Sequence, residues 1–413
     1  MKSTWLVLVA SCLALHVQAN IGSPRVSNVD VTQRKQGVAT VTYDLDEDAV
    51  VTAEFLVDGE PIDALNVQTL EGDVCRMVAA GAGRSFTWTA HRDWPGHVFK
   101  TDSFSVRLTV YPPLRPPDYM VCDLRSTAPE PRIRYYATSN AVPGGVSNRM
   151  YKTDYLVMRR IPAAMVRQRQ GSPEGTVLRG KNETNHYCTI TRDYYMAIYE
   201  FTEAQNANVG GGRQDTFDFQ SDPDAQYYPL TGAYWKNDIR GSVGPDAAPA
   251  SGKTIEKLRT RTGIATFDLP TDAQWEYACR AGTLTTLNDG TESGASGSAG
   301  YNLLLELAWF DGNAEDHPHE VGLKKPNAWG LYDMLGNVGE WCLDKDAPYR
   351  VDDDVVDPLL TTGTGFAVRG GSFANSPSRC TSSSRDSAHG GWSGANKARL
   401  FGFRPVCKIP VQR

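Results

Sequence analysis

From residue 20 to about residue 112, apolar and polar side chains alternate in short runs. Successive side chains of a β-strand point to opposite faces of a sheet, so a period of two predicts strands with one buried face. Such runs cover residues 38–43, 50–57, 85–89 and 104–110. The second run ends at Asp58-Gly59, a pair that favours a tight hairpin turn.

The spacing of these strands, with no helical period between them, predicts a small antiparallel β-sandwich of immunoglobulin or fibronectin type over residues 20–112. No catalytic constellation falls within it, and modules of this kind usually act as spacers or adhesive units. Residues 112–117 contain four prolines, which predict a stiff extended linker because proline fixes φ and cannot donate to a ladder. We assign residues 113–155 to this linker and to lead-in strands of a second domain, residues 156–413.

The pattern changes in the second domain, where glycines, aromatics and turn residues dominate. One helix is predicted over residues 271–280. Pro270 precedes a threonine N-cap, and Gln274 lies three residues after Thr271, as in a capping box. Residues 284–300 are rich in Gly, Ser and Thr and predict an exposed loop.

The first nineteen residues predict a signal peptide. Lys2 supplies the positive end, residues 5–17 are almost wholly apolar but too short to span a bilayer, and residues 17–19 form a small-x-small cleavage site. The mature protein would then be secreted, periplasmic or held at the cell surface. Residues 9–12 also resemble a lipoprotein box, so lipid anchoring at Cys12 is an alternative. No later stretch of sequence is apolar enough to predict a transmembrane segment.

The charge of the chain limits the kinds of partner it can bind, and its cysteine count limits the disulfides it can form. The net charge is −6, and Lys and Arg are scattered, which argues against nucleic acid as a partner. Export would permit disulfides. Loss of Cys12 with the signal peptide leaves seven of the eight cysteines, an odd number, so at least one thiol is expected to be free or paired between chains.

Five sequence blocks of the second domain occur in the order and spacing of the formylglycine-generating enzyme (sulfatase-modifying factor) family, which this domain resembles. They end in Glu-Phe-Thr, Trp-Glu-Tyr-Ala, Gly-Asn-x-x-Glu-Trp, Gly-Gly-Ser-Phe and Gly-Phe-Arg, and they cover residues 193–202, 269–278, 326–341, 368–373 and 402–404. The resemblance implies an α+β fold of C-type-lectin-like type, with a small central sheet, long ordered loops and bound calcium.

The resemblance places a calcium site on the side chains of Asp333 and Glu340 and the carbonyls of Gly336 and Val338. Calcium takes six to eight hard oxygens, and a Gly-rich turn between two carboxylates suits it. We therefore expect calcium as a cofactor. A capped turn with Glu340 solvated or paired to an arginine is the alternative.

The resemblance also implies an oxidase that converts a sulfatase cysteine to formylglycine with two copper-binding cysteines. Thiolates are the soft ligands that Cu(I) selects. The first of these cysteines falls on Asn375, and the second on Cys380, so one thiolate is missing. Ser372 is retained as the second catalytic candidate. In the family's substrate groove, a tryptophan falls on Gly339 and an asparagine on Leu400.

Cys380 has two interpretations. It is either the remaining active-site thiol or the counterpart of a structural cysteine that forms a disulfide with the cysteine of the Trp-Glu-Tyr helix, here Cys279. We favour the Cys279–Cys380 disulfide. His317 and His319, with carboxylates nearby, are metal-ligand candidates by composition alone. We favour the alternative, a polar surface loop before the calcium turn.

Two functions follow from these observations. The first is an exported, calcium-stabilised binding protein without oxidase activity, whose groove, widened at Gly339, takes a peptide or glycan. The second is an active formylglycine-generating oxidase that acts on a sulfatase polypeptide, uses copper, and draws its second thiol from Cys342 or Cys407. The missing thiolate at Asn375 favours the first.

Overall fold

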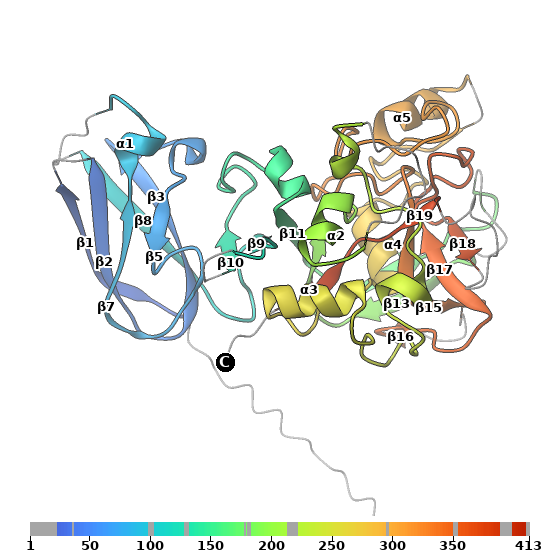
Figure 1. Cartoon of the computed structure of the whole chain (residues 1–413), viewed down its shortest axis with the longest axis horizontal. Coiled ribbons are helices and arrows are strands. Elements are labelled where there is room, and N and C mark those ends of the chain that lie inside the picture. The colour runs from blue at the N-terminus through green and yellow to red at the C-terminus, as the bar shows by residue number, and fades with distance from the viewer. Residues whose placement is uncertain are drawn as a thin grey trace, which may run out of the picture.

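The structure of the chain is a computed structural model. It describes residues 23–34, 37–97, 103–127, 132–176, 179, 183–212, 222–294, 297–349, 354–388 and 399–409. The expected signal peptide and Cys12 lie outside the described residues. Figure 1 shows the N-terminal strands on one side, the loop-rich C-terminal part on the other, and a pair of strands between them.

The N-terminal part contains two antiparallel sheets. The first has the strand order β1-β2-β7-β5, and in the second β3 pairs with β4, β6 and β8. These strands are β1 (Val26–Arg34), β2 (Val38–Leu45), β3 (Ala49–Val57), β4 (Glu60–Pro61), β5 (Leu70–Gly72), β6 (Met77–Val78), β7 (Gly81–Trp88) and β8 (Phe104–Tyr111), with the short helices η1 (Ala64–Asn66) and α1 (Ala90–Asp93) beside them.

Aromatic side chains join the two sheets. Phe55 of β3 lies 4.5 Å from Trp88 of β7 and 6.4 Å from Phe86, measured between ring centroids. The alternation of β2 is confirmed, since every second residue from Ala39 is buried. The hairpin at Asp58-Gly59 is also confirmed: both residues have positive φ, and Val57 pairs with Glu60.

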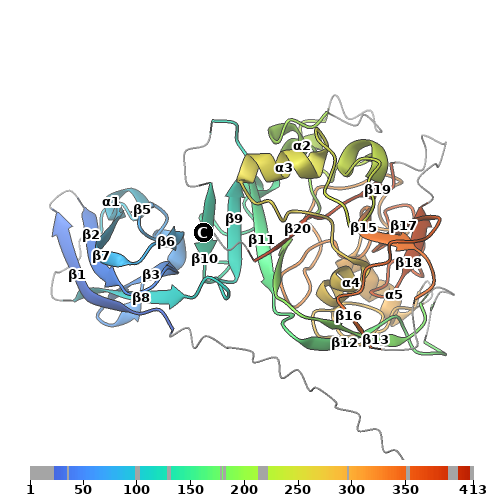
Figure 2. The same cartoon turned by 90° about the horizontal axis from the view of Figure 1, so that it is seen from below.

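A five-stranded sheet lies next to this N-terminal part, and its strand order is β10-β9-β11-β14-β20. It begins directly after the proline-rich segment, and Figure 2 shows β9 and β10 facing the N-terminal sheets. Its strands are β9 (Tyr119–Asp123), β10 (Ile133–Tyr136), β11 (Tyr155–Ile161), β14 (Tyr194–Ala197) and β20 (Val406–Lys408). Because β20 pairs with β14, this sheet contains residues that lie far apart in the sequence.

The rest of the chain is loop-rich and carries two small sheets. Their orders are β12-β13-β16 and β18-β17-β15-β19. The strands are β12 (Val166–Gln170), β13 (His186–Ile190), β15 (Gly339–Asp346), β16 (Val355–Val356), β17 (Gly365–Arg369), β18 (Arg385–Ala388) and β19 (Phe401–Gly402); the helices are η2 (Arg149–Lys152), α2 (Glu203–Asn208), η3 (Ala225–Tyr227), η4 (Trp235–Ile239), α3 (Thr254–Thr262), α4 (Asp272–Arg280) and α5 (Ala299–Leu307).

Helix α4 begins as the sequence predicts. The Thr271 hydroxyl accepts a hydrogen bond from the Gln274 amide, and the Gln274 side chain accepts one from the Thr271 amide. The two bonds satisfy two of the donors that a helix N-terminus leaves unpaired. The expected exposed loop 284–300 is corrected in part, because Thr286, Leu287 and Asn288 are buried and α5 begins at Ala299.

Buried ion pairs hold α4 against the sheet of β15, β17 and β18. Arg369 of β17 pairs with Asp272, at 2.6 Å, and with Glu276. Arg385 of β18 also pairs with Asp272 at 2.6 Å. All four side chains are almost fully buried. Buried charges are tolerated only when they are paired in this way.

Within the described ranges, no helix is both long and apolar enough to cross a membrane.

Candidate functional site

The turn that precedes β15 is strained and fully enclosed. Asp333, Gly336 and Asn337 all have positive φ, which costs energy for residues with a Cβ. A Cβ on Gly336 would lie 2.1 Å from the carbonyl oxygen of Trp309, so only glycine fits there. The Asn337 amide donates to that same carbonyl at 2.8 Å. The backbone of the turn is therefore fixed by its neighbours.

Glu200, which follows β14, holds the second half of the turn. Its carboxylate accepts hydrogen bonds from the Asn337 side chain at 2.6 Å and from the Val338 amide at 3.0 Å. The Asn337 side-chain oxygen accepts in turn from the His319 amide at 3.0 Å. Glu200 and Asn337 are completely buried, so this network specifies one arrangement of the turn.

Glu340 is paired with an arginine, as one of the two sequence-based alternatives expected. Arg404 donates to both carboxylate oxygens of Glu340, at 2.8 Å and 3.1 Å. Trp275 of α4 donates to the same carboxylate at 2.7 Å. Arg404 also donates to the carbonyl oxygens of Ala197 and Tyr332, at 3.0 Å and 2.7 Å. This pair is fully buried and joins α4, β14, β15 and the C-terminal segment.

The charge in this region is unbalanced. Glu200, Asp333 and Glu340 are all buried, and Arg404 is the cation that acts on each of them. Burial, followed by the neighbouring Asp333 and Glu340, raises the pKa of Glu200. Burial likewise raises the pKa of Asp333 to about 6. Lys152 and Lys324 also act on Asp333, although Lys152 is paired with Glu320. A bound proton or cation would reduce the repulsion among the three carboxylates.

Calcium fits this arrangement at Asp333. One Asp333 oxygen accepts from the Gly322 amide at 2.6 Å, and the other is buried without a hydrogen-bond partner among the described residues. An unpartnered buried carboxylate oxygen beside a glycine turn is a suitable hard ligand. Glu340 is a poorer donor, because Arg404 and Trp275 already occupy its oxygens. Over the same described ranges, no group of three His, Cys, Asp or Glu side chains has metal-binding geometry, so backbone carbonyls would have to complete such a site.

Ser372, Asn375 and Cys380 lie together after β17. The Ser372 hydroxyl donates to the Asn375 side-chain oxygen at 2.9 Å. The Cys380 thiol donates to the Ser372 carbonyl oxygen at 4.0 Å, a long and weak contact. Cys380 is completely buried, and burial raises the pKa of its thiol to about 12. At neutral pH this sulfur is a protonated thiol, which is a poor nucleophile and a poor metal ligand.

Gly339 and Leu400, two of the residues expected to line a substrate groove, are also brought together. The Gly339 amide donates to the Leu400 carbonyl at 2.8 Å, and Leu400 packs against Ala314, Val338 and Phe373. However, the expectation that Gly339 widens a groove is wrong. A Cβ at Gly339 would meet Val368 at 2.8 Å and Phe401 at 3.0 Å. Phe401 and Val368 therefore fill the space beyond Gly339, which is itself buried.

The expected Cys279–Cys380 disulfide is absent, since all seven cysteines among the described residues are free and buried. The Cys279 thiol instead contacts the Met334 carbonyl at 3.9 Å, whereas the Cys380 thiol contacts that of Ser372. The two sulfurs thus have different carbonyl neighbours. Cys342, a candidate second thiol of the oxidase, contacts the Glu340 carbonyl at 3.9 Å.

His317 and His319 lie close together, with ring centroids 4.4 Å apart. His319 stacks on Trp309 at 3.8 Å, and burial lowers its pKa. Lys324 covers Trp309, with its ammonium 3.7 Å from the ring centroid. The two histidines belong to an aromatic stack beside the turn, and the described residues give them no carboxylate or thiol in metal-binding geometry.

Three residues that carry the site were not assigned a role from the sequence: Glu200, Trp275 and Arg404. The available signal was a charge inside an apolar run, since Glu200 follows residues 194–199, which are apolar or aromatic. Sizeable cavities lie elsewhere. One of about 660 Å³ is lined by Asp193, Arg259 and Asp268 among others, and neither this cavity nor the one described below includes Ser372 or Cys380.

The fold and the site together define a mostly β, loop-rich protein in which a strained turn is held by a buried Glu–Arg pair. The family model described as Sulfatase-modifying factor enzyme 1-like domain matches residues 158–409. The chain therefore belongs to this family. The sequence-based resemblance to the formylglycine-generating enzymes is confirmed.

Several known proteins are similar to this chain. The formylglycine-generating enzyme of Streptomyces coelicolor is 36% identical over 118 residues, which are 27% of this chain and 38% of that protein. The chaperone protein LppX of Paenibacillus barcinonensis is 28% identical over 181 residues, 36% of this chain and 61% of that protein. The chain therefore spans between 38% and 61% of these relatives. Among solved structures, Treponema denticola variable protein 1 matches 62% of this chain and 95% of its own, with 23% identity and a TM-score of 0.48.

Proposed function

We propose that this protein is a calcium-stabilised binding protein that has kept the family's scaffold and has lost copper-dependent oxidation of cysteine. One observation carries the proposal: Cys380 is completely buried with a raised pKa, and Asn375 stands where a second thiolate would be needed. A Cu(I) site requires two accessible thiolates. We propose a peptide or a glycan as the ligand, and a sulfatase polypeptide is one such peptide.

The alternative is an active formylglycine-generating oxidase, and its support is the family itself and the retained Ser372. In that function Cys380 would have to leave its buried position, lose its proton and meet a second thiol. Cys342 and Cys407 are both buried, and burial raises the pKa of each thiol. This favours the binding protein over the oxidase.

A mass-spectrometric oxidation assay separates the two functions. The purified protein is loaded with Cu(I) and incubated with oxygen and a peptide containing Cys-x-Pro-x-Arg, and a formylglycine-generating enzyme serves as positive control. We expect no aldehyde product from this chain. Conversion that disappears in Cys380→Ser would establish the oxidase and overturn the proposal.

The calcium proposal has its own test. Asp333 and the carbonyls of Gly336 and Val338 would hold the ion, which would offset the repulsion between Asp333 and the buried carboxylates Glu200 and Glu340. Binding to the folded state alone must stabilise it, so we expect excess chelator to lower the melting temperature and added calcium to restore it. Asp333→Asn should reduce that dependence. An unchanged melting temperature in chelator would contradict the proposal.

We also propose a type for each domain and a cellular location for the protein. We propose that residues 20–112 form a sandwich of immunoglobulin or fibronectin type, supported by two antiparallel sheets with Phe55 and Trp88 between them. Residues 113–155 would be the linker and lead-in, and residues 156–413 a C-type-lectin-like domain. We further propose export through a signal peptide, residues 1–19. N-terminal sequencing of the mature protein should begin near Asn20; a start at Cys12 would indicate lipid anchoring instead.

A further inference from the structure

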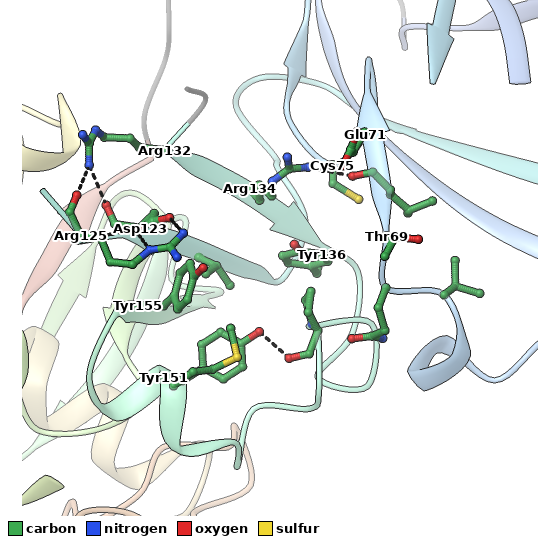
Figure 3. Close-up of a pocket in the computed structure, with 16 residues that line it drawn as sticks. Thr69, Glu71, Cys75, Asp123, Arg125, Arg132, Arg134, Tyr136, Tyr151 and Tyr155 are labelled. Atoms are coloured by element: carbon green, nitrogen blue, oxygen red, sulfur yellow. Dashed lines mark hydrogen bonds and ion pairs between the residues drawn. The ribbon is translucent and has the colours of Figure 1, made fainter. Parts of the chain in front are cut away.

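A cavity of about 310 Å³ lies between the N-terminal sheets and the five-stranded sheet. One wall is formed by β5 and the segment before it, including Thr69, Leu70 and Glu71. The other is formed by β9, β10 and the region of η2, including Arg134 and Tyr155. Figure 3 shows these two walls facing each other across the cavity. The volume is at the lower end of the range typical of small-molecule sites, about 300 to 1,000 Å³.

The two walls are held in place by direct contacts, so the cavity is preformed. The Tyr135 amide donates to the Cys75 carbonyl at 2.7 Å. The Gly144 amide donates to the Gln68 side-chain oxygen at 2.5 Å. Buried residues of both walls, such as Cys75 and Val121, belong to one hydrophobic cluster. A rigid site of this kind costs little ordering when a ligand binds.

Three arginines line the cavity, and they differ in their partners. Arg125 forms a bidentate pair with Asp123, at 2.5 Å and 3.0 Å. Arg132 donates to backbone carbonyls, including that of Arg125 at 2.7 Å. Arg134 makes one long hydrogen bond, at 3.3 Å to the Leu70 carbonyl, and has no ion-pair partner among the described residues. Its guanidinium therefore keeps donors that suit a carboxylate.

The side chain of Glu71 brings a negative charge to the same cavity. Glu71 lines the cavity from β5, directly after the residue whose carbonyl Arg134 contacts. Figure 3 shows the Arg134 side chain extending from β10 toward Cys75 and Glu71. Glu71 is exposed and has no ion-pair partner within the described ranges. Opposite charges that share a cavity without pairing with each other can each bind a group of a ligand.

The remaining surface is aromatic and apolar. Tyr136 and Tyr151 are buried, with exposures of 8% and 1%, and Tyr155 is half-buried. The Tyr151 hydroxyl donates to the Pro143 carbonyl at 2.6 Å, and its ring lies 5.9 Å from that of Tyr155. Met150 completes this side of the lining. Such a surface accepts a ring or an aliphatic side chain.

We propose that this cavity binds a small zwitterion with a ring or aliphatic side chain, as a free amino acid has. The carboxylate would lie at Arg134, the ammonium at Glu71 and the apolar part against the tyrosines. The site is separate from Ser372 and from the 333–340 turn, so it does not depend on the function proposed above. It gives the N-terminal part a role in ligand binding.

The test measures binding to the full chain by calorimetry with three probes: L-phenylalanine, 3-phenylpropionate and phenethylamine. The last two each lack one charged group. We expect L-phenylalanine to bind, and each of the others to bind about tenfold more weakly or worse, because each loses a charge-assisted hydrogen bond. Failure of L-phenylalanine to bind at millimolar concentration would overturn the proposal.

Three variants locate the site. Arg134→Gln should weaken L-phenylalanine about tenfold or more, whereas Arg107→Gln, which breaks an exposed ion pair with Glu54 on β3, should leave it unchanged. Glu71→Gln changes an exposed residue, so the fold should persist. It should reduce the affinity for L-phenylalanine to that for 3-phenylpropionate and leave the latter unchanged. Equal affinities in all three variants would place any binding elsewhere.

Discussion

Glu320 is a buried carboxylate that holds two cations of η2. It accepts from Lys152 at 2.8 Å and from Arg149 at 2.5 Å. Glu320 and Lys152 are buried, whereas Arg149 is half exposed. Burial alone would raise the pKa of Glu320, but the hydrogen bonds from Arg149 and Lys152 outweigh burial and lower it. The ionised form is therefore the one that stabilises the fold.

We predict that Glu320→Gln lowers the free energy of unfolding by about 3 kcal/mol at pH 7, because it leaves the Lys152 ammonium buried without a counter-charge. A lowered pKa means that this stabilisation is present above the ordinary glutamate pKa of 4.5 and is lost as the pH falls through the lowered value. The difference between variant and wild type should therefore shrink in acid. Urea denaturation at several pH values measures it.

The matched control is Glu306→Gln. Glu306 pairs with Lys325, but both side chains are more than half exposed, so that change should cost at most about 1 kcal/mol. A loss for Glu320→Gln that is the same at pH 7 and in acid would contradict the argument, because the pair would then not depend on ionisation.

Single residues also mark the limit of what sequence reasoning reached. Asn375 in place of a thiol was visible by counting from Ser372. The filled space beyond Gly339 was not visible from the sequence, because it depends on Phe401. Phe401 lies beside Gly339 through the parallel pairing of β15 with β19. The buried pair of Glu340 with Arg404 likewise joins residues 64 positions apart. Sequence patterns carry no information on such distant contacts.

Among the elements, α4 was predictable because its start is encoded locally, whereas α3 was not. Helix α3 has the sequence Thr-Ile-Glu-Lys-Leu-Arg-Thr-Arg-Thr, with only Ile255 and Leu258 apolar, and no side chain caps its N-terminus. Its helical state comes from burying those two residues in the core, since tertiary packing provides most helical stability. The strands of the N-terminal part were predictable because their alternation is regular.

The capping box of α4 gives a prediction at this scale. Thr271→Ala removes the hydroxyl that accepts from the Gln274 amide and should lower the free energy of unfolding by about 1 kcal/mol. Thr271→Ser keeps the hydroxyl and should lie close to wild type. Thermal or urea denaturation compares the three proteins. Equal losses in the two variants would assign the effect to the lost methyl group rather than to the cap.

At the scale of the whole molecule, the largest of three hydrophobic clusters extends through both the N-terminal and the C-terminal parts. One cluster of buried residues includes Val41 and Phe55 of the N-terminal sheets, Val121 of the five-stranded sheet and Trp275 of α4. Opening either part would expose apolar surface of the other. The proline-rich segment between them therefore joins two parts that share a core.

We accordingly predict one cooperative thermal transition for the full chain. In scanning calorimetry the measured enthalpy should equal the van't Hoff enthalpy. Two resolved transitions would mean that the parts unfold independently and that their shared contacts contribute little.

The free cysteines make it possible to follow local opening of the folded chain over time. All seven thiols among the described residues are buried, and burial raises the pKa of Cys75 and of Cys380 to about 12. An alkylating reagent reacts with thiolates, so brief pulses should leave the folded chain unlabelled. Cys75 lies in the N-terminal part, and Cys380 lies far from it in sequence. The rate at which each thiol is labelled therefore reports how often its own surroundings open. Peptide mapping after a pulse would show which region opens first.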